Sequence, residues 1–394
     1  MAAIVTDARY RMALAAVRNL GEAGVPVICA EDASIPEGDV LSFRSRYAHR
    51  RLKTPSPAAD PVGFVAALAG AAGPDDVVIP VALASVLALA EFGPRYAGQL
   101  RFVLPPVDTI RLADDTSRLL EVAEKAGVPV PETTYVAEGE TPEQAASRMK
   151  FPVVIKYRHA DALFLPPRER YAIVRDRAEF LRTYPQMAGR QASPIIQEYI
   201  PGTGWGMAAI LDRQRQPLAV FAHRRIREYP ASGGPSSFCE SVHDESLIEY
   251  GVRLLQALGW VGVAMVEFRR DARTGQFRLM EINPRFWGSL PLAIYSGVNF
   301  PLILYRLARE EGVAPHLRYH PGVRMRYILQ DLLSVPGYLR RVPSRGRFVL
   351  GFARDLLDPR VHDGVFRWND LAPSWTYLAR ALRRVKGGGH GQAN

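Results

Sequence analysis

The feature that most constrains the fold of this chain is the stretch 261–290, in which two alternating apolar segments flank a turn. A three-residue loop over 273–275, with its glycine in the positive-φ position, is a common hairpin connection. Counting outward from this loop pairs Ala272 with Gln276. The stretch therefore predicts a β-hairpin.

The same register places Glu267 directly opposite Glu281, and residues that face each other across a hairpin share one face of the sheet. Asn283 lies two residues beyond Glu281 and shares that face. Like charges in this position repel, and desolvated carboxylates are costly. Mg²⁺ would offset the repulsion, because it normally takes one or two carboxylates together with nucleotide phosphates. A solvated sheet face is the alternative interpretation.

The residues that follow the hairpin make the pattern specific. Glu281, Asn283 and Arg285 form a Glu-x-Asn-x-Arg motif after a Glu-bearing strand, and this resembles the metal-binding end of the ATP-grasp superfamily, in its carboxylate–amine ligase-like form. The resemblance implies that Glu267, Glu281 and Asn283 hold Mg²⁺, or Mn²⁺, on ATP. It implies that Arg285 contacts the transferred phosphoryl group or an acyl-phosphate. The match extends over about residues 110–310.

The resemblance carries over to further nucleotide-binding residues. Lys156 ends an apolar strand and corresponds to the lysine that binds the α-phosphate and the adenine side. The segment Glu198, Tyr199 and Ile200 corresponds to the hinge that reads adenine, with Glu198 accepting from the adenine amino group. Arg225 lies in an arginine-rich strand and is expected to contact phosphate or carboxylate, to which guanidinium binds in bidentate geometry.

Strand alternation in that arginine-rich segment predicts two faces. One face would carry His223, Arg225 and Arg227, and the other Arg224 and Glu228. A solvated edge strand is the alternative. The glycines at 202, 204 and 206 are expected to serve a turn into the next strand.

Two segments depart from the ATP-grasp pattern. Thr116 stands where the superfamily normally has a phosphate-binding lysine at the start of a helix, and Arg118 lies on a different face. The stretch 157–164 contains no glycine where a glycine-rich loop normally folds over the phosphates, although backbone amides approach phosphate most easily at glycine.

The chain of 394 residues is long enough for two or three domains, and its class is α/β. We expect a Rossmann-like domain over 1–108 and an ATP-grasp domain over 109–315. The latter is expected to divide into a small lid lobe at about 133–200 and a metal-binding lobe at about 201–315. A basic helical extension over 316–394 would follow. Strands are expected at 2–6, 25–30, 76–80 and 101–104, and helices at 9–23, 82–91, 114–126 and 247–258.

Composition narrows the setting of the protein. Two cysteines, Cys29 and Cys239, fit a reducing compartment. No apolar run reaches the roughly eighteen residues of a membrane span, and the N-terminal residues show no signal-peptide pattern. A cytoplasmic location is therefore expected, with peripheral contact at the inner face of the membrane as a further possibility. The net charge of +10 is concentrated in 316–394, so a nucleic-acid groove in the body is not expected. Basic residues mixed with Trp, Phe and Leu in this tail favour a packed helical extension or an interfacial helix on anionic lipid. A homodimer is a further partner considered.

The function predicted from these residues is an ATP-dependent ligase that joins a small-molecule carboxylate to an amine, or another nucleophile, through an acyl-phosphate, releasing ADP and phosphate. A nucleotide-binding module without turnover is one alternative, which Thr116 and the stretch 157–164 favour. A carboxylase- or carbamoyl-phosphate-synthase-like activity on the same scaffold is the other.

Overall fold

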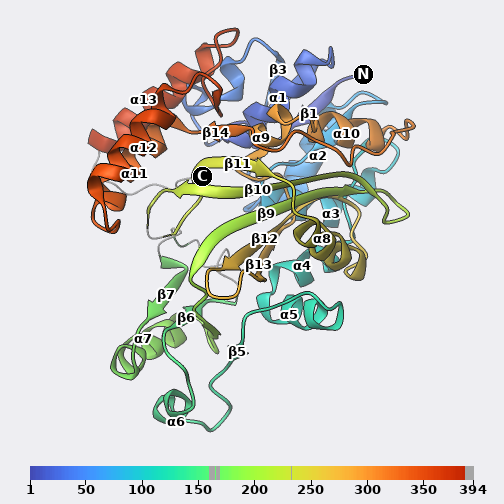
Figure 1. The fold of residues 1–394 in the computed structure, drawn as a ribbon. Helices are drawn as coiled ribbons and strands as arrows, with labels where there is room; N and C mark the ends of the chain where they lie inside the picture. The colour runs from blue at the N-terminus through green and yellow to red at the C-terminus, as the bar shows by residue number, and fades with distance from the viewer. Residues whose placement is uncertain (159–164, 166–168, 232, 387–394) are drawn as a thin grey trace.

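The computed structural model describes residues 1–158, 165, 169–231 and 233–386. Their strands form three sheets, one parallel near the N-terminus, one large and mixed at the centre, and one small and antiparallel at the far end of the molecule (Figure 1). This is the α/β fold class expected from the sequence.

The N-terminal sheet has the strand order β3-β2-β1-β4, and every neighbouring pair is parallel. Strand β3 escaped prediction because its exposed charged residues, His49 to Arg51, hide the alternation of an edge strand. The predicted strand over 101–104 forms only one isolated bridge, between Val77 and Arg101. The elements are β1 (Ala3–Val5), α1 (Arg11–Glu22), β2 (Val27–Asp32), β3 (Ala48–Thr54), α2 (Pro61–Ala71), β4 (Val77–Ile79) and α3 (Leu83–Phe92).

The central sheet has seven strands in the order β13-β12-β9-β10-β11-β14-β15. All pairs are antiparallel except β14 with β15, so the C-terminal region extends the sheet in addition to supplying the predicted helices. The strands are β9 (Gly202–Leu211), β10 (Pro217–Glu228), β11 (Ser236–Val242), β12 (Gly262–Asp271), β13 (Phe277–Asn283), β14 (Arg324–Arg326) and β15 (Val361–Asp363).

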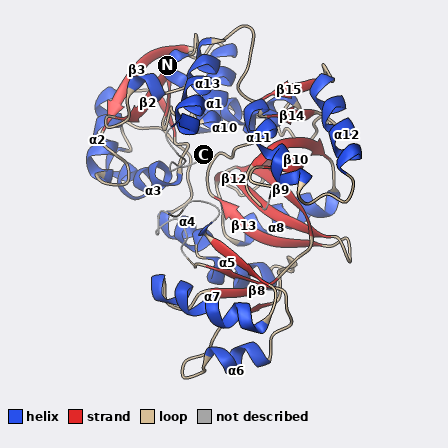
Figure 2. Ribbon diagram, turned by 90° about the vertical axis from the view of Figure 1, so that its left-hand side faces the viewer, coloured by secondary structure: helices blue, strands red, loops and turns tan. Residues whose placement is uncertain are grey.

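The small sheet is antiparallel, with the order β5-β8-β6-β7, and helices α6 and α7 accompany it (Figure 2). Helices α4 and α5 connect the N-terminal sheet to this part of the chain. Its elements are α4 (Val107–Asp114), α5 (Thr116–Lys125), β5 (Thr133–Thr134), α6 (Pro142–Ser147), β6 (Val153–Lys156), β7 (Tyr171–Val174), α7 (Arg177–Arg190) and β8 (Ile195–Glu198).

The two faces of the central sheet pack against different partners, because successive residues of a strand point to opposite faces. On β12, Val263 and Met265 belong to a core shared with α1 and with the helices after the hairpin. Ala264 and Val266 belong to a second core shared with α5 and α8. The remaining helices are α8 (Glu245–Ala257), α9 (Leu290–Tyr295), α10 (Phe300–Ala308), α11 (Ile328–Leu339), α12 (Arg345–Leu357) and α13 (Ala372–Lys386).

A buried ion pair ties the C-terminal region to the first helix. Arg18 on α1 donates from Nε to Oδ2 of Asp370 at 2.8 Å, and both side chains are almost fully buried. The other guanidinium nitrogens donate to the carbonyls of Val365 and Asp370 at 2.7 and 2.8 Å. Ser45 donates to the same carboxylate at 2.7 Å. The pair is therefore satisfied on both sides, and it fixes segment 365–370 on the N-terminal domain.

None of the helices in the described residues is both long and apolar enough to cross a bilayer.

Candidate functional site

The site is built on the hairpin formed by β12 and β13. Glu267 lies directly opposite Glu281, as predicted. Asn283 shares their face, and its Nδ2 lies 3.3 Å from Oε1 of Glu267 and 3.1 Å from Oε1 of Glu281. The structure thus brings together the three residues predicted to hold the metal.

The predicted register is correct at Glu267 for a reason that the sequence did not reveal. The connecting loop is one residue longer than predicted, since the amide of Asp271 donates to the carbonyl of Gln276 at 2.8 Å and the loop spans 272–275. The pairing of Ala272 with Gln276 is therefore wrong. A register shift directly beyond Glu267 compensates and restores the pairing with Glu281.

Arg225 of β10 closes one side of this carboxylate pair. Its Nη2 donates to Oε2 of Glu267 at 2.5 Å. Its Nη1 donates to the carbonyl of Gly234 at 3.2 Å and to Glu228 at 3.4 Å. Arg225 therefore lies within reach of a group bound at the hairpin, and it links the hairpin to the loop that precedes β11.

Two glycines on β9 make room for side chains that cross this strand. A Cβ at Gly204 would lie 2.8 Å from Cδ of Arg225. A Cβ at Gly206 would overlap the ring of His223. Strand β9 pairs Gly206 with both Glu267 and His223, so Glu281, Glu267, Gly206 and His223 form one row across the sheet. These glycines lie within a strand and do not serve a turn, which corrects the expectation from the sequence.

His223 is the residue of the site that sequence reasoning left without a role. Its Nε2 lies 3.0 Å from Oγ of Ser289, and its Nδ1 has no hydrogen-bond partner in the structure. Burial, followed by the charge of Arg225, lowers the pKa of His223 to about 3, so the ring is neutral at physiological pH. The signal that could have found it was the glycine at every second position of the neighbouring strand.

The two faces predicted for β10 are only partly observed. Register shifts follow Arg225 and Arg227, and these bulges break the alternation. Arg227 turns to Asp331 and Asp355, with N–O distances of 2.8 and 2.7 Å. Glu228 contacts Arg225, although strict alternation placed the two on opposite faces.

The electrostatics of the hairpin reflect its two facing carboxylates. Desolvation, together with the neighbouring Glu267 charge, raises the pKa of Glu281, while Lys156 and Arg225 oppose the shift. The Glu281 side chain is exposed, so we assign the larger share of the shift to the Glu267 charge. Desolvation lowers the pKa of Lys156 against the attraction of Glu281. Burial also disfavours the Arg225 cation, but Glu267, Glu228 and Glu281 outweigh it and raise the pKa of Arg225.

The predicted lysine interacts with the hairpin through its charge, from the other sheet. Lys156 is the last residue of β6, as predicted, and its charge interacts with both Glu281 and Glu267. Arg269 of β12 is a second cation at this junction, and the sequence did not single it out. It donates to the carbonyls of Ile200 and Gly202 at 2.6 and 2.8 Å, which joins the hairpin to the predicted hinge.

The hinge residues lie beside the hairpin but already have protein partners. Oε1 of Glu198 accepts from the amide of Glu132 at 3.1 Å, and Oε2 lies 3.4 Å from Arg273. The amide of Tyr199 donates to the carbonyl of Pro152 at 3.2 Å. An adenine read by Glu198 would therefore have to share or replace these contacts.

Arg285 is the predicted residue that the structure does not bring to the carboxylates. Its Nη1 donates to the carbonyl of Phe286 at 3.0 Å, and none of the ion pairs in the described ranges includes it. The side chain is half-buried and follows Asn283 by two positions.

Of the two departures from the ATP-grasp pattern, the structure describes the one at Thr116 and only the start of the other. Thr116 begins α5, whose N-cap residue Asp115 accepts from the amides of Ser117 and Arg118. Arg158 lies 3.6 Å from Asp115, so a cation does reach this helix start. Most of the glycine-poor stretch 157–164 lies outside the described residues.

The chemistry of the donor set fits Mg²⁺ bound together with phosphates. No group of three His, Cys, Asp or Glu side chains that could hold a metal by itself occurs among the residues with described placement. Two carboxylates and one amide oxygen are what Mg²⁺ takes when phosphate oxygens complete its octahedron. Repulsion between Glu267 and Glu281 gives these residues an intrinsic preference for a cation.

The three sheets and the charged hairpin agree with the ATP-grasp resemblance of the sequence. A family model described as "ATP-grasp in the biosynthetic pathway with Ter operon" matches residues 191–330. Residues 191–330 therefore belong to the ATP-grasp superfamily, as the sequence motif implied.

Three known proteins illustrate what the chain is similar to. It is 24% identical over 179 residues to D-alanine–D-alanine ligase of Stutzerimonas stutzeri, a match that covers 44% of this chain and 55% of that one. Biotin carboxylase of Campylobacter jejuni superposes with a TM-score of 0.66 at 18% identity, over 82% of this chain and 74% of that chain. The biotin carboxylase domain of the Hydrogenobacter thermophilus 2-oxoglutarate carboxylase, a dimer solved with MgADP and bicarbonate, gives 0.62 at 15% identity, over 82% and 73%. The chain spans about half the length of the curated relatives it matches.

Proposed function

We propose that this protein is an ATP-dependent ligase that joins a carboxylate to an amine, or a related nucleophile, with release of ADP and phosphate. The observation that carries the proposal is the convergence of Glu267, Glu281 and Asn283 with the cations Arg225 and Lys156. Carboxylates of the hairpin thus interact with one cation of the same sheet and one of the small sheet.

The proposed reaction has two steps. An oxygen of the carboxylate substrate attacks the γ-phosphorus of ATP, the bond to the β-phosphate oxygen breaks, and ADP leaves with those electrons. The amine nitrogen then attacks the acyl carbon, the carbon–oxygen bond to phosphate breaks, and the nitrogen loses a proton. Phosphoryl transfer of this kind depends on positioning and on charge neutralisation more than on a covalent nucleophile of the protein.

The residues of this chain would divide that work. Glu267, Glu281 and Asn283 would hold Mg²⁺, or Mn²⁺, which neutralises phosphate charge when bound. Lys156 would contact the α-phosphate from the small sheet. Arg225 would move from Glu267 to the transferred phosphoryl group as the metal takes the carboxylate.

The remaining predicted residues complete the nucleotide site. Glu198, with the backbone at Tyr199 and Ile200, would hold adenine at the hinge. Arg285 would have to turn from the carbonyl of Phe286 to reach the phosphoryl group or an acyl-phosphate. We also propose a cytoplasmic location and retain a homodimer as a candidate assembly, since one structurally similar protein is a dimer.

A carboxylase-like reaction is the second candidate, and the structural similarity to biotin carboxylase favours it. In that reaction bicarbonate would take the place of the carboxylate substrate. A binding module without turnover is the third candidate. It draws support from Thr116 at the position where a phosphate-binding lysine is usual.

Oxygen transfer from the carboxylate distinguishes these candidates. ADP release from Mg-ATP is measured with pools of ¹⁸O-labelled carboxylic acids and of amines, and separately with labelled bicarbonate. The ligase predicts that ¹⁸O from the organic acid appears in the phosphate only when ADP forms. Label arriving only from bicarbonate supports the carboxylase, and tight Mg-ATP binding without ADP release under any pool supports the binding module.

A variant and a matched control make the result specific to the hairpin. Glu281→Ala is expected to abolish the label transfer. Glu249→Gln, on an exposed position of α8, is expected to retain it. Equal activity of wild type and Glu281→Ala would contradict the assignment of the site.

A further inference from the structure

The C-terminal helices expose an unusual share of the apolar surface of this protein. Fourteen large hydrophobic side chains are exposed in the described residues, and ten of them lie between residues 328 and 386. They are Leu332, Leu333, Val349, Leu350, Leu356, Leu357, Trp368, Leu371, Trp375 and Leu382. Scattered single residues of this kind are normal, but a concentration on one segment marks an interaction surface.

On α12 and α13 these residues follow helical spacing on the outer sides of the helices. On α13, Trp375, Ala379 and Leu382 are exposed at i, i+4 and i+7, while Ser374 points inward and is buried. Trp375 is 65% exposed, and Trp368 in the preceding loop is 93% exposed. The apolar stripe of α13 thus faces solvent, although its opposite face is packed on the N-terminal domain.

Helix α12 also exposes apolar side chains to solvent. Phe348 and Phe352 are partly buried, and Phe348 stacks on Tyr338 of α11 at 5.5 Å between ring centroids. Leu350 and Leu357 project outward and are 74% and 80% exposed. The helix is therefore anchored by one aromatic edge and presents leucines one heptad apart to solvent.

The three helices lie on the same side of the molecule. They gather along the left of the view in Figure 1 and face the viewer in Figure 2, away from the small sheet and its hinge. We call the exposed apolar residues of α11, α12 and α13, with their basic neighbours, the C-terminal face.

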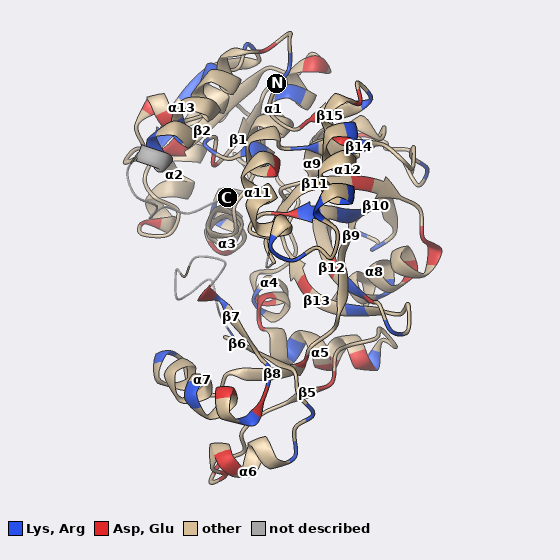
Figure 3. Cartoon of the chain, turned by 60° about the vertical axis from the view of Figure 1, so that its left-hand side comes forward, with Lys and Arg blue, Asp and Glu red and all other residues tan. Residues whose placement is uncertain are grey.

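The C-terminal face is basic, because the region has few acidic residues and most of these are paired with arginines. Residues 316–394 contain fourteen Lys and Arg against five Asp. Asp331 and Asp370 are buried against Arg227 and Arg18. Basic positions recur along α12 and α13 in Figure 3.

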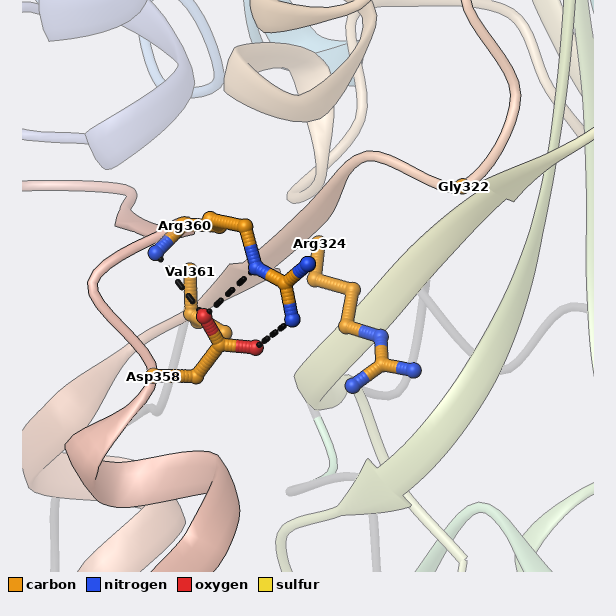
Figure 4. Close-up of a pocket in the computed structure, with 5 residues that line it drawn as sticks. All are labelled: Gly322, Arg324, Asp358, Arg360 and Val361. Carbon is orange, nitrogen blue, oxygen red and sulfur yellow. Dashed lines mark hydrogen bonds and ion pairs between the residues drawn. The ribbon is translucent and has the colours of Figure 1, made fainter.

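Of the three remaining aspartates, Asp363 accepts from backbone amides, and the other two pair with arginines. Asp355 contacts Arg227. Figure 4 shows Asp358 bound by Arg360, with two N–O distances of 3.0 Å, while Arg324 turns away from both. Among the described ion pairs none includes Arg347 or Arg354 of α12, so these cations are available to an outside partner.

We infer that the C-terminal face docks on an anionic lipid bilayer. Exposed Trp and Leu beside Arg is the composition of surfaces that bury their apolar residues at the headgroup boundary and bind anionic lipid by charge. A second copy of the chain would bring like charge against like charge and is the less favourable occupant. None of the residues of this face belongs to the hairpin, and membrane attachment goes beyond the proposed ligase reaction.

Vesicle binding tests the inference. The full chain is sedimented with vesicles of phosphatidylcholine alone, and with vesicles of equal parts phosphatidylcholine and phosphatidylglycerol. Binding is expected only to the mixed vesicles, with a shift of Trp fluorescence to shorter wavelength. It is expected to be lost at about 1 M salt, where the screening length falls to about 3 Å.

Surface variants distinguish vesicle binding through the C-terminal face from unspecific binding through the net positive charge. Leu350→Glu with Leu357→Glu, and separately Arg347→Glu with Arg354→Glu, are expected to weaken binding by about tenfold or more. Tyr135→Glu and Arg182→Glu alter exposed residues in the region of the small sheet and are the matched controls, with binding expected to stay within about twofold of wild type. Circular dichroism and ATP binding check that each variant is folded.

Three results would overturn the inference. One is no binding to the mixed vesicles at low salt. Another is equal loss of binding in the controls and in the α12 variants. The third is a concentration-dependent dimer, seen by analytical ultracentrifugation, that the leucine variants abolish while vesicle binding is absent throughout, because a second copy would then cover the face.

Discussion

Two clusters of charge in this protein are built in opposite ways. Around Asp370 each charge is matched, since Arg18 and Ser45 satisfy the carboxylate and backbone carbonyls satisfy the guanidinium. At the hairpin, Glu267 and Glu281 face each other, and the pKa of Glu281 is raised. The first arrangement is what structure requires, and the second keeps unfavourable energy that a bound cation would relieve. The contrast separates a structural cluster from a functional one.

The largest effect should come from breaking the structural cluster. Asp370→Ala leaves the Arg18 cation buried, where burial already lowers its pKa, and is expected to cost about 3–5 kcal/mol of unfolding free energy. Urea denaturation measures the cost, and Asp363→Asn, at a second carboxylate of the same region, is the comparison. A change below about 0.5 kcal/mol in Asp370→Ala would remove the contrast.

Substitutions at the hairpin carboxylates should reduce activity far more than stability. Glu267→Gln and Glu281→Ala are expected to lower ADP-forming turnover about 100-fold or more, because phosphate charge would lose its neutralising metal. The unfolding free energy of Glu281→Ala should not fall, because Glu281 accepts no hydrogen bond from an arginine of the described residues. A variant that loses turnover only in proportion to lost folded protein would show that these residues are structural.

A side chain at Gly206 tests whether the row of Glu281, Glu267, Gly206 and His223 contributes to nucleotide binding. Gly206→Ala puts a methyl group into the His223 ring and is expected to cost about 1–3 kcal/mol of stability, with reduced nucleotide binding as β10 shifts. Gly275→Ala is the control for glycine loss alone, since its positive φ of 73° lies in an open loop. Nucleotide binding is measured by calorimetry, and equal binding in both variants would contradict the role of the row.

The smallest expected effect is a gain in stability when the charge of Glu281 is removed, opposite in sign to the loss expected for Asp370→Ala. The raised pKa of Glu281 means that the folded state holds its proton at pH values where the unfolded chain has released it, so stability falls as pH rises above the ordinary glutamate range. Glu281→Gln should therefore stabilise the protein in metal-free buffer at neutral pH, by less than about 1 kcal/mol for this exposed side chain. The gain should vanish near the ordinary glutamate pKa. Thermal unfolding across pH measures it, and a loss of stability at neutral pH would reverse the electrostatic account.

The sequence predicted the fold class and the gathering of three donors because both depend on local patterns. Alternation in β12 and β13, together with the Glu-x-Asn-x-Arg motif, was enough to place Glu267, Glu281 and Asn283 on one face. The loop length was wrong, and a bulge that alternation cannot reveal compensated for it.

The features that the sequence did not predict depend on contacts between distant segments. Arg227 reaches Asp331 across 104 positions, and the bulges that turn it away from Arg225 follow from strand pairing. The pairing of β14 with β11 joins residues about 85 positions apart, and no local pattern signals such a contact. His223 acquires its position only through Gly206 on the neighbouring strand. The predicted domain boundaries at residues 108, 200 and 315 stay a prediction.

The most direct test of the central claim is the dependence of ATP binding on Mg²⁺ in wild type and in Glu281→Gln, measured by calorimetry. If the hairpin is the metal site, wild type binds ATP much more tightly with Mg²⁺ than with EDTA, and the variant loses that difference while remaining as stable as wild type or more so. Equal Mg²⁺ dependence in the two proteins would contradict the account.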